Sequence, residues 1–461
     1  MTPPAPKRKT PRMTTRTLHR LYPDYTYSRA PIEACFWAEA VPETALACPP
    51  ATGRLRVPVL VVGGGFTGLN AALSLARAGE EVMLIEASFP AFGASGRNGG
   101  FCCLGSSRAT DRQLMRFGPD GAGEVRRAEA AAIRHVDRVI TDLGLDVDRH
   151  STGETILAHS PAAQAKMAEK AEEYSGDYGV EMRVMDKADL VDEGLDGPTW
   201  FGGMHNPLGF ALHPRKYALG LLQAALAAGA RVHGESPALS VERTGTTLTV
   251  TTPEAVIEAD RVLFATNGYT AENLVPWLKG RTLPAQSSVL ATRPLTEEEL
   301  RAQGYWSRQM AYEDRRLLHY FHLTPDGRMI FGQRGGLLSD PVTEKKIAAT
   351  VRADFDRAFP AWAHVETPWS WSGMVCLTAS LTPFCGAIPG LPGAFAAFGY
   401  HGNGVAMGSY LGARMAELSR GETPAEILPK AFATPPMRFP LGRFRRVILA
   451  AEYGQAKLFN L

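Results

Sequence analysis

The chain has 461 residues, more than one ordinary domain holds, so we expect two or three domains. Hydrophobic residues make up 45% of the sequence and charged residues 21%, a balance typical of a soluble globular protein. Lys and Arg number 49 against 47 Asp and Glu, so no positive field indicates that the body of the chain binds nucleic acid.

The N-terminal region is predicted to begin with a disordered basic tail, residues 1–24. This tail has no acid before Asp24 and lacks the apolar run that a secretory signal needs. Contact with RNA or a membrane, or a transit-like role, are the alternative interpretations. Aromatic residues then recur over 25–51, and we expect this segment to pack onto the body as a lid or strap. The basic residues of the tail are Lys7, Arg8, Lys9, Arg12, Arg16 and Arg20.

A glycine-rich turn follows the first apolar run of the chain. Val59–Val62 predict a strand, and residues 63–68 match G-x-G-x-x-G before a helical pattern. In such a turn Gly63 permits the bend, Gly65 lets a pyrophosphate approach the backbone, and Gly68 lets the helix pack close to the strand. Glu86 ends the second strand, where a carboxylate can accept hydrogen bonds from ribose hydroxyls. We therefore predict a dinucleotide site with the phosphates at the helix N-terminus.

The next stretch, Phe92–Phe101, is rich in Gly, Ser and Asn. Such a run cannot form a core, but its successive backbone N–H groups can form an anion-binding concavity. Because it directly follows the second strand of the nucleotide unit, we interpret it as a cofactor contact, with an ordinary surface loop as the alternative.

Periodicity predicts the elements in the middle of the chain. Helices are expected over 120–143, 162–174, 217–228 and 344–359. A short strand and a small helix are expected within 180–193. Further strands are expected over 152–158, 231–233, 239–243, 247–251, 283–294 and 365–375. The region 317–333 predicts two strands joined by the hairpin turn Pro325-Asp326-Gly327.

Two later stretches place small or polar residues where a ligand would bind. Residues 258–268 predict a buried strand that ends in Ala265-Thr266-Asn267-Gly268, and ligands bind at such ends in open α/β sheets. Phe395–Phe398 predicts another strand. The glycine turn 400–405 follows it and leads into a helix over 406–418, whose N-terminus can face a cofactor.

Near the C-terminus, an apolar stripe recurs at helical spacing beside basic residues at 443, 445 and 446. A membrane-surface helix is one interpretation of this pattern. Packing against the body is the interpretation that we adopt. The stripe consists of Phe444, Val447, Ile448 and Ala451.

The six cysteines are few for the length and fit no zinc spacing. We therefore expect reduced thiols, no metal site and a cytoplasmic location.

Four blocks, in this order, resemble the flavin-dependent amine oxidase family that includes D-amino acid oxidases, sarcosine and glycine oxidases, and gamma-glutamylputrescine oxidases. The blocks are the turn 63–68 with Glu86, the run 93–100, the run 265–268 and the turn 399–405. They span about 57–418, which is most of the chain. The second block is most similar to the gamma-glutamylputrescine oxidase branch.

The resemblance implies an α/β fold. It consists of a Rossmann-like FAD-binding domain built from separated segments and an α+β substrate domain with an antiparallel sheet. We assign 55–145, 205–280 and 370–425 to the FAD-binding domain, and 146–204 and 281–369 to the substrate domain. Residues 426–461 would form a C-terminal helical extension.

The resemblance also implies FAD as the cofactor and distributes its contacts. The first block would hold the ADP half with Glu86 at the ribose, the second would pass the pyrophosphate and flavin, the backbone near Ala238 would meet the adenine, and the last turn would meet the flavin ring. The predicted cofactor residues are Gly63, Gly65, Phe66, Thr67, Gly68, Glu86, Ala87, Ser95, Arg97, Asn98, Gly99, Gly100, Ala238, Thr266, Asn267, Gly268, Gly402, Asn403, Gly404 and Val405.

The chain departs from the family pattern in places. Asn403 stands where a histidine is common, and Met329–Gln333 lacks the lysine that sarcosine oxidases use toward oxygen. Cys376 occupies a place that resembles their flavin-attachment cysteine, and we expect a buried, unreactive thiol there.

By resemblance, the reaction is oxidation of the C–N bond of an amine or amino acid to an imine, with O2 as acceptor and H2O2 as product. One alternative is a dehydrogenase that passes electrons to a quinone or carrier and touches a membrane through its C-terminal helix. The other is a flavoprotein component of RNA modification, which only the basic tail supports. A small-molecule amine and O2 are the expected partners, and nucleic acid is not.

Four side chains are candidates for the substrate pocket. His401 adjoins the predicted flavin turn, so we assign it a base role as a hypothesis. Tyr320 and His322 are further catalytic candidates, although packing within a strand or facing solvent explains them equally. Arg334 could bind a substrate carboxylate through two hydrogen bonds, or it could be a surface arginine at a strand end.

Overall fold

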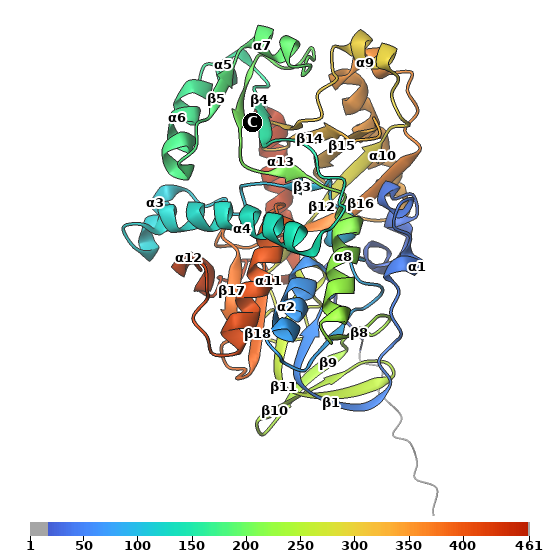
Figure 1. Ribbon diagram of the computed structural model, residues 1–461, viewed down its shortest axis with the longest axis vertical. Coiled ribbons are helices and arrows are strands. Elements are labelled where there is room, and N and C mark those ends of the chain that lie inside the picture. Colours follow the sequence, from blue (N-terminus) through green and yellow to red (C-terminus); the bar gives the residue numbers. More distant parts are fainter. Residues whose placement is uncertain (1–16, 460–461) are drawn as a thin grey trace, which may run out of the picture.

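The computed structural model describes residues 17–459. Within this range it contains two eight-stranded sheets and a small two-stranded one. Figure 1 shows the first large sheet in the lower part of the molecule, with the second above it. The predicted α/β architecture with a separate antiparallel sheet is confirmed. Among residues 17–459, no helix is long and apolar enough to cross a membrane.

The first sheet is built around β1 (Gly53–Val62), which lies between two parallel neighbours. Its strand order is β17-β18-β11-β1-β2-β8, and the antiparallel hairpin β9–β10 extends from β11. The predicted run Val59–Val62 is buried throughout, as expected for a parallel strand covered on both faces. The other strands are β2 Val82–Ile85, β8 Arg231–His233, β9 Ser240–Thr244, β10 Thr247–Thr251, β11 Ala255–Phe264, β17 Phe384–Ala387 and β18 Ala394–Phe398.

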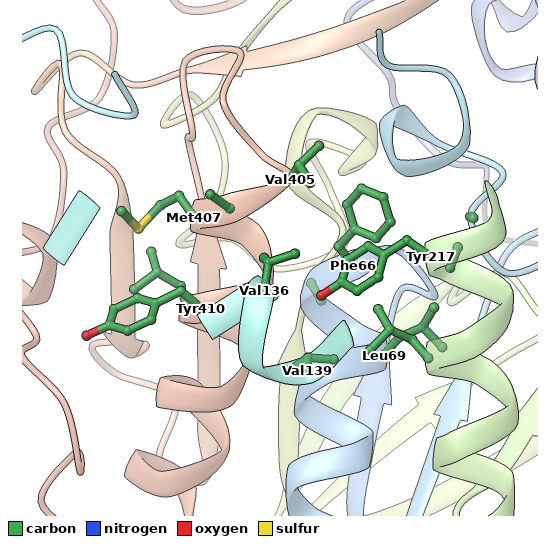
Figure 2. Packing of buried hydrophobic residues seen from close by; sticks show 14 of the residues in the cluster. Phe66, Leu69, Val136, Val139, Tyr217, Val405, Met407 and Tyr410 are labelled. Carbon is green, nitrogen blue, oxygen red and sulfur yellow. The ribbon is translucent and has the colours of Figure 1, made fainter. Parts of the chain in front are cut away.

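Four helices pack together on this sheet: α2 (Phe66–Arg77), α4 (Gly121–Leu143), α8 (Pro214–Ala227) and α11 (Ala406–Ser419). Figure 2 shows their shared core, in which Phe66 packs beside Tyr217. The helices α2 and α11 approach so closely that a Cβ on Gly412 would lie 2.2 Å from the Thr67 carbonyl oxygen. The hydroxyl of Thr67 lies 2.8 Å from that of Tyr400. The two predicted glycine turns are therefore neighbours in space, 333 residues apart in sequence.

The second sheet has the order β16-β12-β15-β14-β13-β4-β6-β5 and is antiparallel except between β13 and β4. Side chains alternate between its faces, so Phe321 and Phe331 pack with α10 (Pro341–Ala358) while Tyr320 and Arg334 face the opposite way. Its strands are β4 Glu154–Leu157, β5 Arg183–Met185, β6 Gly203–Asn206, β12 Leu283–Ala291, β13 Met310–Glu313, β14 His319–Leu323, β15 Met329–Arg334 and β16 Trp369–Leu377. Because β16 belongs to this sheet, the segment 370–425 assigned to the FAD-binding domain begins inside a strand of the second sheet.

The remaining elements are short or lie outside the two sheets. The two-stranded sheet consists of β3 (Phe101–Cys102) and β7 (Phe210–Ala211). The other α-helices are α1 Glu43–Leu46, α3 Asp111–Leu114, α5 Pro161–Gln164, α6 Met167–Tyr178, α7 Lys187–Asp192, α9 Glu297–Gln303, α12 Lys430–Ala433 and α13 Arg446–Phe459. The 3-10 helices are η1 Asp24–Tyr27, η2 Ala30–Ile32, η3 Phe36–Ala38, η4 Ala94–Gly96, η5 Met115–Phe117, η6 Asn267–Tyr269, η7 Pro360–Trp362 and η8 Gly442–Phe444.

The N-terminal region corrects part of the predicted tail. Residues 1–16 lie outside the described range, but residues 17–24 pack on the body instead of forming a tail. Leu18 joins a hydrophobic cluster, and the buried Tyr22 donates its hydroxyl hydrogen to the Pro284 carbonyl at 3.1 Å. Packing of the segment 25–51 is confirmed, because Trp37 is buried and its indole N–H donates to the Asn98 carbonyl at 2.9 Å.

The C-terminal helix presents a different face from the predicted one. Phe444 and Val447 are 60% and 58% exposed, whereas Leu449 is buried against the second sheet. Arg445 is fully buried and pairs with Glu272 at 2.5 Å. The prediction that the apolar stripe packs on the body is therefore wrong, because Arg445, paired with the half-buried Glu272, takes the inward position.

Several element boundaries also differ from the predicted ones. The first strand begins at Gly53, six residues before the predicted run Val59–Val62. Pro58 is tolerated within this strand because the β1–β2 ladder starts only at Val59. The helix predicted over 162–174 is two helices, α5 and α6. The helix α9 was not among the predicted elements, although Thr296 and Glu299 form its capping box.

Candidate active site

One cavity of about 1000 Å³ lies between the two large sheets. It joins the first glycine turn, the run 93–99, the end of β11 and the turn before α11 to one face of the second sheet. Most of the predicted cofactor residues line it. Those that line it are Gly63, Gly65, Phe66, Thr67, Glu86, Ala87, Ser95, Arg97, Asn98, Gly99, Ala238, Thr266, Asn267, Gly402, Asn403, Gly404 and Val405. The predicted residues Gly68, Gly100 and Gly268 lie behind this wall.

The first glycine turn has the geometry that its sequence predicts. Gly63 has a φ of +109°, and a Cβ on Gly65 would lie 2.8 Å from the Ser95 hydroxyl. That hydroxyl accepts a hydrogen bond from the Phe66 N–H at 2.9 Å, so the run 93–100 is tied to the start of α2. A Cβ on Gly68 would lie 1.8 Å from the Gly63 carbonyl oxygen, which shows why only glycine allows this helix–strand contact.

Glu86 lies where the sequence places it, at the end of β2 and in the cavity wall. Its carboxylate accepts hydrogen bonds from the Gly64 N–H at 2.6 Å and the Ser88 N–H at 3.2 Å. Burial raises the pKa of Glu86, and these backbone donors oppose that effect. Each oxygen keeps a lone pair for another donor, so the residue is held in position to receive hydroxyl groups.

Arg97 is buried in the cavity wall beneath the second sheet. It is 2% exposed, and its Nε–H donates to the Phe92 carbonyl at 2.7 Å. Its Nη1 donates to the Ser372 carbonyl at 3.3 Å, whereas Nη2 has no hydrogen-bond partner among the described residues. A buried cation with a free donor indicates a polar or anionic group that belongs in the cavity.

The turn before α11 contacts both the second sheet and the loop after β3. Gly402 has a φ of +110°, and a Cβ there would lie 2.5 Å from Nη2 of Arg334. The Asn403 amide donates to the Leu104 carbonyl and accepts from the Cys103 thiol at 3.5 Å. The predicted Asn403 thus fixes the loop after β3 against the flavin turn.

The second sheet supplies the opposite wall. Tyr320, Arg334, Ser287 and Val289 share one sheet face and line the cavity. The Tyr320 and Ser287 hydroxyls lie 3.0 Å apart, and a Cβ on Gly99 would lie 2.6 Å from the Tyr320 ring. Within residues 17–459, Arg334 forms no ion pair with a carboxylate. This wall therefore offers a phenol and an uncompensated guanidinium.

The two predicted histidines lie outside the cavity lining. His401 is buried, its Nδ1 lies 2.8 Å from the Ser106 carbonyl, and its Nε2 accepts from the Thr378 N–H at 3.2 Å. Burial lowers the pKa of His401 to about 4. Both ring nitrogens are engaged in the interior, so His401 supports the turn, and we assign it no base role.

His322 is also fully buried and does not face solvent. Its Nε2 lies 2.8 Å from the Gly99 carbonyl, and its Nδ1 lies 2.9 Å from Nε2 of His150. Burial, together with the neighbouring His150, lowers the pKa of His322 to about 3. The side chain supports the run 93–100 from behind, so its predicted catalytic role is not carried forward either.

Other lining residues were missed from the sequence. Glu154, Tyr312 and Arg108 line the cavity, and so does Tyr27 of the N-terminal strap. An acid at an inward position of a predicted strand was the available signal for Glu154. Cys376 also lines the cavity, and burial raises the pKa of its thiol to about 12, in keeping with the expected unreactive cysteine.

A dinucleotide cradle that opens onto a sheet with a free guanidinium is the arrangement of a nucleotide-dependent oxidoreductase that acts on a small polar substrate. Residues 58–418 match the family model DAO, described as FAD dependent oxidoreductase. The chain belongs to this family and uses FAD as its cofactor. It is an enzyme of the oxidoreductase class.

Relatives and solved structures agree with this family. The chain is 31% identical over 417 residues to a probable oxidoreductase OrdL of Rhizobium meliloti, covering 90% of this chain and 94% of that protein. It is 30% identical to gamma-glutamylputrescine oxidoreductase of Escherichia coli, over 85% and 90% of the two chains. The glycine oxidase structure from Geobacillus kaustophilus has the same fold, with a TM-score of 0.67, 19% identity, and 82% of this chain and 99% of that chain covered.

The residues present fit FAD. The glycine turn leaves backbone open for phosphates at the α2 N-terminus, Glu86 can take the ribose hydroxyls, and the cavity continues past Ala238. Arg97 keeps a free buried donor for an electron-rich group. The α11 N-terminus, at Gly404 and Val405, adds a second positive helix end to the same cavity.

Proposed function

We propose that this enzyme oxidises the C–N bond of a small amine or amino acid to an imine and passes the two electrons to O2, giving H2O2. The observation that carries the proposal is the single cavity that joins the cofactor residues to Tyr320 and Arg334. A relative named gamma-glutamylputrescine oxidoreductase and the fold shared with a glycine oxidase support an amine as the substrate class.

The protein's own part in this reaction is binding and orientation. Bound FAD supplies the acceptor for the hydride that leaves the carbon next to nitrogen. Arg334 sits against Gly402, so a substrate carboxylate that it binds would lie beside the turn before α11. Tyr320 lies on the same sheet face as Arg334, against Gly99, and its hydroxyl lies 3.0 Å from that of Ser287.

The reacting nitrogen must be neutral, because a protonated amine cannot release hydride from its adjacent carbon. The cavity favours the neutral amine through burial, since desolvation lowers the pKa of an ammonium group. The imine leaves the site and hydrolyses to a carbonyl compound and an amine.

The test is a hydrogen-peroxide assay of purified yellow protein across amines and amino acids under air. For at least one compound, we expect the amount of H2O2 formed to match the amount of substrate consumed. Anaerobic reduction by a substrate, followed by mixing with air-saturated buffer or with a quinone, separates an oxidase from a dehydrogenase. A flavin that no amine bleaches would contradict the proposal.

A further inference from the structure

The cavity contains a buried carboxylate that the reaction as proposed does not use. Glu154, the first residue of β4, is 2% exposed and lines the cavity. Its Oε1 accepts a hydrogen bond from the Asn206 amide at 3.2 Å. Its Oε2 is buried and accepts no N–H or O–H hydrogen bond from the described residues, and the weakly donating thiol of Cys103 lies beside the carboxylate. A buried carboxylate oxygen without a strong hydrogen-bond donor is destabilised, so a ligand that donates to it would be stabilised there.

Tyrosine side chains line the cavity together with Glu154. The register pairs Met310 with Glu154 and Tyr312 with Ile156, so Tyr312 and Glu154 point to the same face. Tyr174 and Tyr178 of α6 line the same cavity, and their rings lie 5.9 Å apart. The Tyr178 hydroxyl is already engaged with Glu129 at 2.8 Å.

No Lys, Arg or His side chain among the described residues forms an ion pair with Glu154. Lys170 lines the cavity, but its ammonium pairs with Asp314 at 2.6 Å. Within residues 17–459, Glu154 forms no ion pair. Phenol rings around a lone carboxylate form the environment that binds an ammonium group, through charge attraction and cation–π contact.

The carboxylate is also close to the reacting end of the cavity. Cys103 lies beside Glu154, and its thiol donates to Asn403 of the flavin turn at 3.5 Å. One side chain thus separates Glu154 from that turn, which is within reach of a short substrate.

We propose that Glu154, with Tyr312 and Tyr174, forms a subsite for a second cationic nitrogen of the substrate, so that the enzyme prefers amines with two ammonium groups over monoamines. This inference rests on the proposed amine oxidation and names its substrate class. Burial raises the pKa of Glu154 to about 8, so an incoming cation would restore the charge that burial disfavours.

The test compares matched substrates on the FAD-loaded full chain. The kcat/KM values for α,ω-diaminoalkanes of three to six carbons are measured against those for 1-aminoalkanes of equal length, with an artificial electron acceptor. The wild type should prefer at least one diamine tenfold or more. Glu154→Gln keeps the shape of the side chain and should abolish that preference, with monoamine values changing less than threefold. Glu172→Gln, which removes an exposed acid of α6 that does not line the cavity, should keep the preference.

Two kinetic outcomes would overturn the subsite. One is a wild type that does not distinguish the two series. The other is a Glu154→Gln variant that loses both series equally, because Glu154 would then act on the reacting nitrogen that both share. Retained yellow colour and melting temperature show that the variant is folded.

A second readout separates this inference from the proposed function. The melting temperature of the wild-type holoenzyme should rise more with a diamine than with its matched monoamine, and Glu154→Gln should remove the difference. If no amine is oxidised, the proposed function fails while this shift still tests the subsite. Equal shifts in melting temperature for the diamine and the monoamine would reject the subsite.

Discussion

Glu313 Oε2 lies 2.7 Å from Nδ1 of His319, and both side chains are buried. The other ring nitrogen of His319 lies 3.2 Å from Asp354, so the imidazole bridges two carboxylates. Burial alone would lower the pKa of His319, but its hydrogen bonds to Asp354 and Glu313 raise it. Burial alone would raise the pKa of Glu313, yet His319 and Arg315 lower it to about 2. The two carboxylates behind the substrate wall therefore favour the protonated form of the ring.

This bridge predicts a pH-dependent contribution to stability. The raised pKa of His319 makes its contribution complete below about pH 6.5, its unfolded value, and lost as pH rises through the folded value. The lowered pKa of Glu313 makes its contribution present above about pH 4.3 and lost as pH falls toward 2. His319→Gln should therefore lower the free energy of unfolding by about 3 kcal/mol near pH 5.5 and by less at pH 9. Melting temperatures of the wild type and the variant at the two pH values check this.

His364 offers a matched control for that experiment. It lies 2.9 Å from Glu299 but is exposed, so solvent screens the pair. His364→Gln should change the melting temperature little at either pH. An equal loss for His319→Gln at both pH values would show that packing, not charge, is the source of its stability.

Gly65→Ala should weaken FAD retention. The added methyl group would lie 2.8 Å from the Ser95 hydroxyl, which holds the Phe66 N–H at the start of α2. We expect at least a tenfold loss of FAD affinity, about 1.4 kcal/mol, read from the ratio of absorbance at 450 and 280 nm after dilution. Gly176→Ala is the control, because its Cβ meets nothing within 4 Å in α6. Full flavin content in Gly65→Ala would contradict the cradle.

Arg334→Met should discriminate between substrates with and without a carboxylate. The guanidinium has no ion-pair partner among residues 17–459, so its loss leaves no protein acid unpaired. For amino acids, kcat/KM should fall roughly 10- to 100-fold, in line with about 1.5–3 kcal/mol for a charged hydrogen bond. Simple amines should change little. Arg316→Met is the control, since Arg316 lines the same cavity but lies 3.7 Å from Glu452. Equal losses on both substrate types would exclude carboxylate binding by Arg334.

His401→Ala should leave the shape of the pH–rate profile unchanged. Its pKa, lowered by burial to about 4, keeps the ring neutral between pH 6 and 10. The substitution leaves the Ser106 carbonyl and the Thr378 N–H without this partner, so we expect a loss of about 1–3 kcal/mol in stability. A profile of kcat/KM against pH that lost one limb would restore the base role for this residue.

The local features of the cofactor site could be predicted from the sequence. Gly63, Gly65 and Gly68 are required by a turn whose geometry is set within six residues, and Glu86 follows from the length of one strand–helix–strand unit. The long helix α4 and the hairpin β14–β15 were equally readable, because period and turn chemistry act over short distances. Membership of the flavoprotein family rested on the same local blocks.

Only the tertiary structure decided which side chains reach the substrate end. Glu154 and Tyr312 meet through the parallel pairing of β4 with β13, which joins segments more than 150 residues apart. His401 adjoins the right turn in sequence, yet it is engaged by Ser106 and Thr378 in the interior. Arg445 displaced the apolar stripe because it pairs with the half-buried Glu272 at 2.5 Å. A strand's inward face depends on its distant partners, and no local pattern contains that information.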